Sequence, residues 1–196
     1  MNLRLILLLI IPLFFNPLFS QSYNKEESLK AFEYLNTFRQ NPKEEAKKIE
    51  LRLKKIKPAQ TLKWNETLAR IAKERAMDMA ENNYFRHRDK KGKAINYKLK
   101  KGGYTIYKLY TKDKGFNSFE SISAGMSTGI ESIKSLIIDE GVKSKGHRKH
   151  LLGIDIKNSF PQNSTLYDCG IAFVDASNTK AKYQSYVVVI IAKHEY

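Results

Sequence analysis

The chain has 196 residues, and its 35 lysine and arginine side chains outnumber its 20 aspartate and glutamate side chains, for a formal net charge of +15. Its single cysteine excludes an internal disulfide, so stability must come from a buried core. The positive charge is mostly lysine spread along the chain. This pattern favours charge-driven attraction to anionic surfaces, and it does not support specific nucleic-acid binding, which relies on arginine forks.

The first 20 residues are typical of a secretory signal peptide. Arg4 supplies a positive start, residues 5–15 form an apolar run, and Ser20 is a small residue suited to cleavage. The run is shorter than the ~20 residues that span a bilayer, so we expect no transmembrane segment. We therefore predict removal of residues 1–20 and a single domain over residues 21–196. The mature protein should be secreted and extracellular, or periplasmic.

Three helices are predicted in the first half of the chain. Apolar residues recur every three positions over residues 26–39, and residues 43–55 are rich in Glu, Ala and Lys. A third helix, running to about residue 82, starts at Asn65, a good N-cap. Residues 90–117 are basic, rich in Tyr and Gly, and without clear periodicity, so we expect a long surface loop there.

The middle of the chain predicts a strand followed by a helix. Over residues 119–126, alternate residues starting at Glu120 share one face. Thr128 and Glu131 match a capping box at the start of a helix that reaches about residue 140. Residues 155–165 are polar and predict a loop.

The last third of the chain predicts two strands. Residues 167–174 alternate, whereas residues 186–192 are continuously apolar, as in a strand covered on both faces. Residues 175–184 join them as a hairpin. A sheet covered by helices on both faces requires a three-layer α/β/α sandwich.

Histidines and acidic residues in four separate segments are the candidate site. His147 lies in the segment 146–153, which also contains His150, and His87 follows the third predicted helix. Neutral imidazoles with carboxylates form a conventional site for zinc or another divalent ion. We expect four side chains to meet in one cleft: His87, Glu120, His147 and either Asp139 or Glu140.

Two further residues are expected to have no functional role. His150 lies in a basic run, where a histidine is usually solvated rather than a ligand. Cys169 shares one strand face with Ile171 and Phe173, which predicts a buried, inert thiol.

Five short motifs follow one another along the chain: Leu35-Asn36-x-x-Arg39, Leu62-x-Trp64-Asn65-x-x-Leu68, Phe85-x-His87, the segment 119–125, and Ser144-Lys145-Gly146-His147-Arg148. Together they resemble the CAP superfamily of cysteine-rich secretory, antigen 5 and pathogenesis-related 1 proteins. The single cysteine favours the bacterial, SCP-like extracellular type. The resemblance implies an α/β/α sandwich with a mostly antiparallel central sheet.

The resemblance also implies the site. The family's cleft holds two histidines and two acidic residues, and the histidines bind zinc in some members. Carried over by motif, these are His87, Glu120 and His147. The second acid is Asp139 or Glu140, because the helix before the segment with His147 can be aligned either way, and we prefer Asp139. The implied metal ligands are His87 and His147.

Three functions follow as hypotheses. The first is a secreted binding module whose cleft takes a divalent metal and a lipid or sterol, a glycan or a peptide. The second is a metal-dependent, peptidase-like hydrolase in which Glu120 or Asp139 acts as general base. The third is a charge-driven polyanion-binding protein. No recognisable nucleophile accompanies the site, which favours binding over catalysis.

Overall fold

The structure is a computed structural model that describes residues 21–53, 56–154 and 167–194. The predicted signal peptide and the polar loop expected over residues 155–165 lie outside the described residues. Within these ranges, no helix combines the length and the apolar character needed to cross a membrane.

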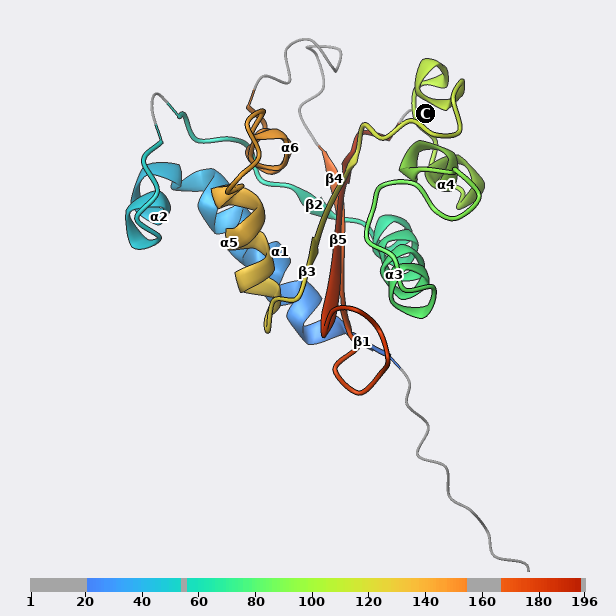
Figure 1. The fold of residues 1–196 in the computed structure, drawn as a ribbon. Coiled ribbons are helices and arrows are strands. Elements are labelled where there is room, and N and C mark those ends of the chain that lie inside the picture. Colours follow the sequence, from blue (N-terminus) through green and yellow to red (C-terminus); the bar gives the residue numbers. More distant parts are fainter. Residues whose placement is uncertain (1–20, 54–55, 155–166, 195–196) are drawn as a thin grey trace, which may run out of the picture.

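A five-stranded sheet forms the centre of the fold (Figure 1). Its strands are β1 (Ser22–Asn24), β2 (Lys63–Trp64), β3 (Glu120–Ala124), β4 (Asp168–Asp175) and β5 (Ser185–Ala192). The order β1-β4-β5-β3 is antiparallel throughout, and β2 pairs in parallel with β4. All eight residues of β5 are buried, as the continuous apolar run predicts.

Helices cover both faces of this sheet, which confirms the predicted α/β/α sandwich (Figure 1). One layer contains α1 (Lys25–Gln40), α2 (Pro42–Lys48), α5 (Gly129–Ile138) and α6 (Gly146–Leu152), and the other contains α3 (Glu66–Glu81) and α4 (Ile95–Lys101). Each layer has its own apolar core, because the side chains of a strand alternate between the two faces. Cys169 is buried in the core beneath α1 and α5, and burial raises the pKa of its thiol, as expected for an inert cysteine.

The helix α3 shows how the sequence positions the site. The Asn65 side chain accepts a hydrogen bond from the backbone N–H of Leu68 at 3.1 Å, so the predicted N-cap is confirmed. The apolar stripe of α3 packs on β4 so closely that a Cβ at Gly170 would collide with the backbone of Leu68 and Ala69. This contact holds the first turn of α3 against the sheet, and the chain leaves the other end of the helix towards His87.

Two helix boundaries differ from the prediction. The helix expected over residues 43–55 ends at Lys48, and Glu50 takes a left-handed conformation with φ 54°, which no α-helix contains. The helix after Thr128 ends at Ile138 because Asp139 is also left-handed, with φ 51°. In the capping box, Thr128 accepts from the N–H of Glu131, whose carboxylate bonds the N–H of Ser127 instead of that of Thr128.

The long surface loop predicted over residues 90–117 is wrong. This segment contains α4 and a 3-10 turn, η1 (Lys108–Thr111), and it buries Ile95, Leu99 and Tyr104 against α3. Helix α4 was missed because its seven residues supply only two apolar anchors among lysines, too few for a periodic signal. The two shortest strands, β1 and β2, were also not predicted.

Candidate functional site

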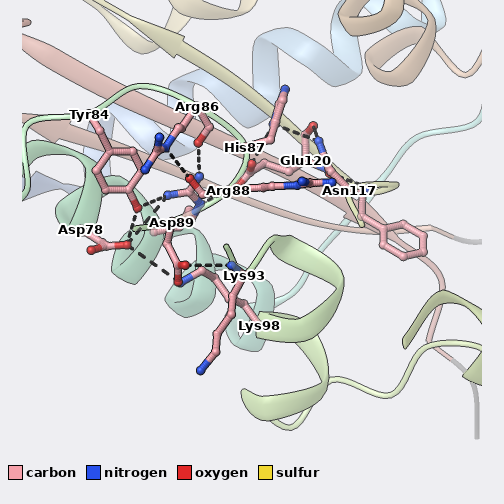
Figure 2. Close-up of polar contacts among 12 residues, drawn as sticks. Asp78, Tyr84, Arg86, His87, Arg88, Asp89, Lys93, Lys98, Asn117 and Glu120 are labelled. Carbon is pink, nitrogen blue, oxygen red and sulfur yellow. Dashed lines mark hydrogen bonds and ion pairs between the residues drawn. The ribbon is translucent and has the colours of Figure 1, made fainter. Parts of the chain in front are cut away.

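A buried ion pair supports the first half of the site. Glu120 begins β3, and its carboxylate is fully buried beside the guanidinium of Arg75 from α3, with 3.0 Å between Nε and Oε2. Its other oxygen lies 2.9 Å from Nδ1 of His87. Figure 2 shows His87 and Glu120 beside Asn117, with Tyr84 and Arg86 next to them. A carboxylate paired with Arg75 accepts hydrogen bonds, so Nδ1 of His87 is the donor in this contact, and in the neutral ring Nε2 is then an acceptor.

Arg75 extends this support towards the loop that carries His87. Its guanidinium donates to the hydroxyl of Tyr84 and to the carbonyl of Arg86, the residue before the histidine. Arg75 lies on the apolar stripe of α3, four residues after Ile71 and four before Met79. An arginine on a buried stripe needs a buried partner, and this signal could have identified Arg75 from the sequence.

Asn117 completes the first half. Its Oδ1 accepts from the backbone N–H of Glu120 at 3.0 Å, and its Nδ2 donates to the carbonyl of the same residue at 3.0 Å. The same Nδ2 lies 2.9 Å from Nδ1 of His87. Asn117 therefore fixes the start of β3 beside the imidazole, while the hydrogen-bond partner of Nδ1 is the Glu120 carboxylate. No motif in the sequence distinguishes it from other loop asparagines.

Asp139 forms the second half with His147. Its carboxylate is buried, with Oδ1 2.7 Å from Nδ1 of His147 and Oδ2 accepting from the backbone N–H groups of His147 and Arg148 at 3.0 and 3.3 Å. One side chain thus caps α6 and orients the imidazole that α6 carries. The alternative acid, Glu140, is exposed and makes no contact with the site.

The two halves face each other. The ring centroids of His87 and His147 are 6.3 Å apart, with 35° between the ring planes. Both Nδ1 atoms face carboxylates, and neither Nε2 takes part in a hydrogen bond with another residue of the described ranges. The rings border an open cleft of about 290 Å³. The structure thus brings His87, Glu120, Asp139 and His147 together.

The metal-binding capacity of this cleft is limited to the two imidazoles. Among the described residues, no three His, Cys, Asp or Glu side chains are grouped so that they could hold one metal ion. Both carboxylates are occupied as partners of Nδ1 atoms, so only the Nε2 atoms of His87 and His147 are available as protein ligands. This fits an open two-histidine site and does not fit a closed structural zinc site.

The expectation that His150 is solvated is wrong. Its ring lines the inner end of the cleft, with Nδ1 2.7 Å from the hydroxyl of Ser121 and Nε2 buried. Burial lowers the pKa of His150 to about 4, so the ring is neutral at physiological pH. The basic run misled the prediction because α6 turns His150 inward while Lys149 is exposed.

The fold is an α/β/α sandwich, and one open cleft holds two histidines, each on a buried carboxylate. These are the architecture and the side chains that the resemblance in the sequence implied. Residues 32–189 match the family described as CAP: Cysteine-rich secretory protein family, and the chain belongs to this family.

Two solved structures are similar to this one. An outer surface protein from Borrelia burgdorferi is 17% identical with a TM-score of 0.50, covering 89% of this chain and 98% of that chain. An extracellular protein containing an SCP domain, from Bacillus anthracis str. Ames, is 20% identical with a TM-score of 0.48. The match covers 86% of this chain and 41% of that one, so this chain spans less than half of it. A comparison with curated proteins found no match.

Proposed function

We propose that this protein is an exported binding module whose cleft takes a divalent metal ion, zinc being the first candidate, together with a small polar ligand. The observation that carries the proposal is the facing pair of imidazoles, His87 and His147, each with Nδ1 on a buried carboxylate. A neutral imidazole held in this way keeps its Nε2 lone pair available, and carboxylate–histidine pairs orient metal ligands in many proteins.

The two imidazoles leave room for the ligand at the metal. Zinc in proteins commonly has four ligands, so water and the bound molecule would supply the others. When bound, the metal would act as a Lewis acid that attracts an oxygen atom of the ligand. Glu120 and Asp139 hold the imidazoles and remain outside the coordination shell. We therefore expect a lower affinity than that of a structural zinc site.

The lining of the cleft favours a peptide or a glycan over a lipid or sterol. Besides the histidines, its walls consist mainly of hydroxyl and amide side chains, with Val142 as the one aliphatic residue among those that line it. The volume of about 290 Å³ suits a short polar segment. A lipid tail would need a larger apolar surface.

The carboxylates are the reason why we propose binding rather than hydrolysis. A general base needs a free oxygen within reach of the water that it activates. In Glu120 one oxygen contacts Arg75 and the other contacts His87, while both oxygens of Asp139 face α6. Each acid is almost completely buried.

Export of the protein is part of the proposal. It is supported by the charged and apolar start of the chain and by the similar structure from Borrelia burgdorferi, whose description names an outer surface protein. N-terminal sequencing of the exported protein should begin after about residue 20. An intact Met1 would contradict export through a cleaved signal peptide.

Calorimetric titration with zinc at pH 7.5 tests the cleft. We expect His87→Ala and His147→Ala each to weaken zinc binding by at least about tenfold, because each removes one of two protein ligands. Asp139→Asn should weaken it about tenfold, since loss of the carboxylate releases the orientation of His147.

The matched control is His194→Ala, which removes a histidine that does not line the cleft. This variant should bind zinc as the wild type does. Equal losses in His194→Ala and His147→Ala, with unfolding transitions unchanged, would place the zinc outside the cleft and overturn the proposal.

A further inference from the structure

A second hollow, separate from the cleft, lies between α3 and the segment 89–102. Its volume of about 750 Å³ exceeds the 290 Å³ of the cleft. None of the four side chains that meet in the cleft lines it. The hollow exists because α4 packs on α3 through Ile95 and Leu99, which leaves the charged edges of the two helices facing each other.

The charges on its walls are unbalanced. Seven basic and three acidic side chains line the hollow. The acidic ones already have partners: Glu74 pairs with Arg70 at 2.7 Å, Asp89 pairs with Lys98 at 3.0 Å, and Asp78 accepts from Tyr84. The acidic side chains therefore do not neutralise the remaining cations.

Three lysines carry the unneutralised charge. Lys90, Lys91 and Lys101 are exposed, and none of their ammonium groups makes a hydrogen bond or ion pair with another residue that the structure describes. Lysine ammonium groups act as strongly hydrated point charges, which suit separate anionic groups on a flexible ligand better than the flat edge of a base.

The turn that presents these lysines is held in shape. The Asp89 carboxylate accepts from the backbone N–H groups of Lys91 and Lys93 at 2.9 and 2.8 Å, and the Asp89 N–H donates to the Lys93 carbonyl at 2.9 Å. Figure 2 shows Asp89 beside Lys93, Lys98 and Asp78. A turn fixed in this way lowers the ordering cost of binding, because the backbone behind the lysines is already in place.

One aromatic ring lies among the cations. Tyr97 of α4 lines the hollow, with Nζ of Lys93 4.8 Å from the centre of its ring. A bond from Lys93 and the positive field of Lys93, Lys101 and Lys114 lower the pKa of its hydroxyl, which shows how positive this wall is. A flat ring beside point charges suits a sugar ring that carries anionic substituents.

We propose that this hollow binds an acidic oligosaccharide, a short sugar chain with sulfate, phosphate or carboxylate groups. The unpaired lysines bind the anionic groups, and Tyr97 contacts the face of one sugar ring. The volume falls in the range of sites for small ligands. Single-stranded nucleic acid fits less well, since successive bases stack on several aromatic rings and this hollow has one. The proposal is independent of metal binding in the cleft.

The test uses a fully sulfated heparin hexasaccharide, titrated calorimetrically at 0.15 M NaCl. The site variant is the triple substitution Lys90→Gln, Lys91→Gln and Lys101→Gln. The control is the triple Lys43→Gln, Lys112→Gln and Lys180→Gln, which removes the same charge from exposed lysines that do not line the hollow. We expect the site triple to weaken binding at least about tenfold and the control triple less than about threefold.

Three results would overturn the proposal. Equal losses of affinity for the sulfated hexasaccharide in the two triple variants would show attraction to the overall charge instead of binding at a site. A neutral hexasaccharide, or a single-stranded oligonucleotide of matched charge, that binds as tightly as the sulfated probe would exclude an acidic sugar as the preferred ligand. Loss of binding in His147→Ala would move the site to the cleft. Unchanged binding in His147→Ala would support a separate site.

Discussion

His150 is kept neutral by its surroundings. Its ring is packed at the inner end of the cleft, Nδ1 pairs with the hydroxyl of Ser121, and Nε2 is buried without a hydrogen bond of normal geometry. Burial is the main cause that lowers the pKa of His150 to about 4, and the nearby His147 and Arg39 side chains lower it further. A proton on this ring would place a positive charge in a site whose carboxylates already face Arg75, His87 and His147.

The free energy of unfolding should therefore decrease as the pH drops below about 6.5, the usual pKa of a histidine in an unfolded chain. In the unfolded chain His150 takes up a proton as the pH falls through 6.5, whereas the folded chain takes it up only near pH 4. The stabilisation that comes from the neutral His150 is thus fully present above pH 6.5 and is lost between pH 6.5 and 4, by about 1.4 kcal/mol per pH unit. The total loss of stability over this range is on the order of 3 kcal/mol.

Urea unfolding of wild type and His150→Gln at several pH values measures this effect. The wild type should lose more stability than the variant between pH 6.5 and 4, because both proteins share every other titrating group. Parallel curves for the two proteins would contradict a neutral, buried His150.

Asp139 shows why the sequence left two candidates for the second acid. The position needs a left-handed backbone, which aspartate tolerates better than glutamate, and a side chain short enough to reach the N–H groups of α6. Both conditions come from the turn between α5 and α6, and helical spacing does not reveal them. Glu140, one residue later, is exposed.

At the scale of elements, the close contact between α3 and β4 holds the first half of the site. Gly170 has no Cβ, and this lets the backbone of Leu68 and Ala69 approach the strand directly. If α3 lay farther from β4, Arg75 would move away from Glu120. The buried ion pair therefore depends on a glycine in another element.

Gly170→Ala should destabilise the protein by about 3 kcal/mol or more, because the added methyl group collides with backbone atoms that cannot move alone. The matched control is Gly146→Ala, whose Cβ would meet only the hydroxyl of Ser144 at 3.5 Å, an ordinary contact. It should change stability by less than about 0.5 kcal/mol. Urea unfolding at pH 7.5 measures both, and a similar effect of the two substitutions would contradict this account of the contact.

Elements with a strong pattern could be predicted from the sequence, and those held by distant partners could not. The periodic stripe of α3 and the apolar run of β5 identified both elements, since each buries a full face along its length. Helix α4 depends on two apolar anchors that pack on α3. Helix α2 ends early at Lys48, although the residues after it are good helix formers.

At the scale of the whole molecule, the residues that line the cleft come from both helical layers and from the edge strand β3. His87 follows α3 in one layer, whereas His147 belongs to α6 in the other. Glu120 begins the strand between them. An edge strand has no further neighbour in the sheet, so segments from both layers can come together there.

This arrangement explains how much of the site the sequence could identify. His87, Glu120 and His147 lie far apart in the chain, and spacing alone offered only weak support; the motifs shared with the family placed these three together. The supporting residues Arg75 and Asn117 belong to no such motif. The position of Arg75 on an apolar stripe signals a buried partner but does not name it, and no sequence signal marks Asn117.

The most direct test of the cleft is a nuclear magnetic resonance measurement of the imidazole nitrogens at pH 7.5, before and after one equivalent of zinc. If buried carboxylates hold both rings, His87 and His147 must be protonated at Nδ1 and unprotonated at Nε2. On addition of zinc, the Nε2 signals of these two histidines should shift together, while those of His150 and His194 should stay in place. Protonated Nε2 atoms in the metal-free protein, or zinc shifts confined to His150 or His194, would contradict the account.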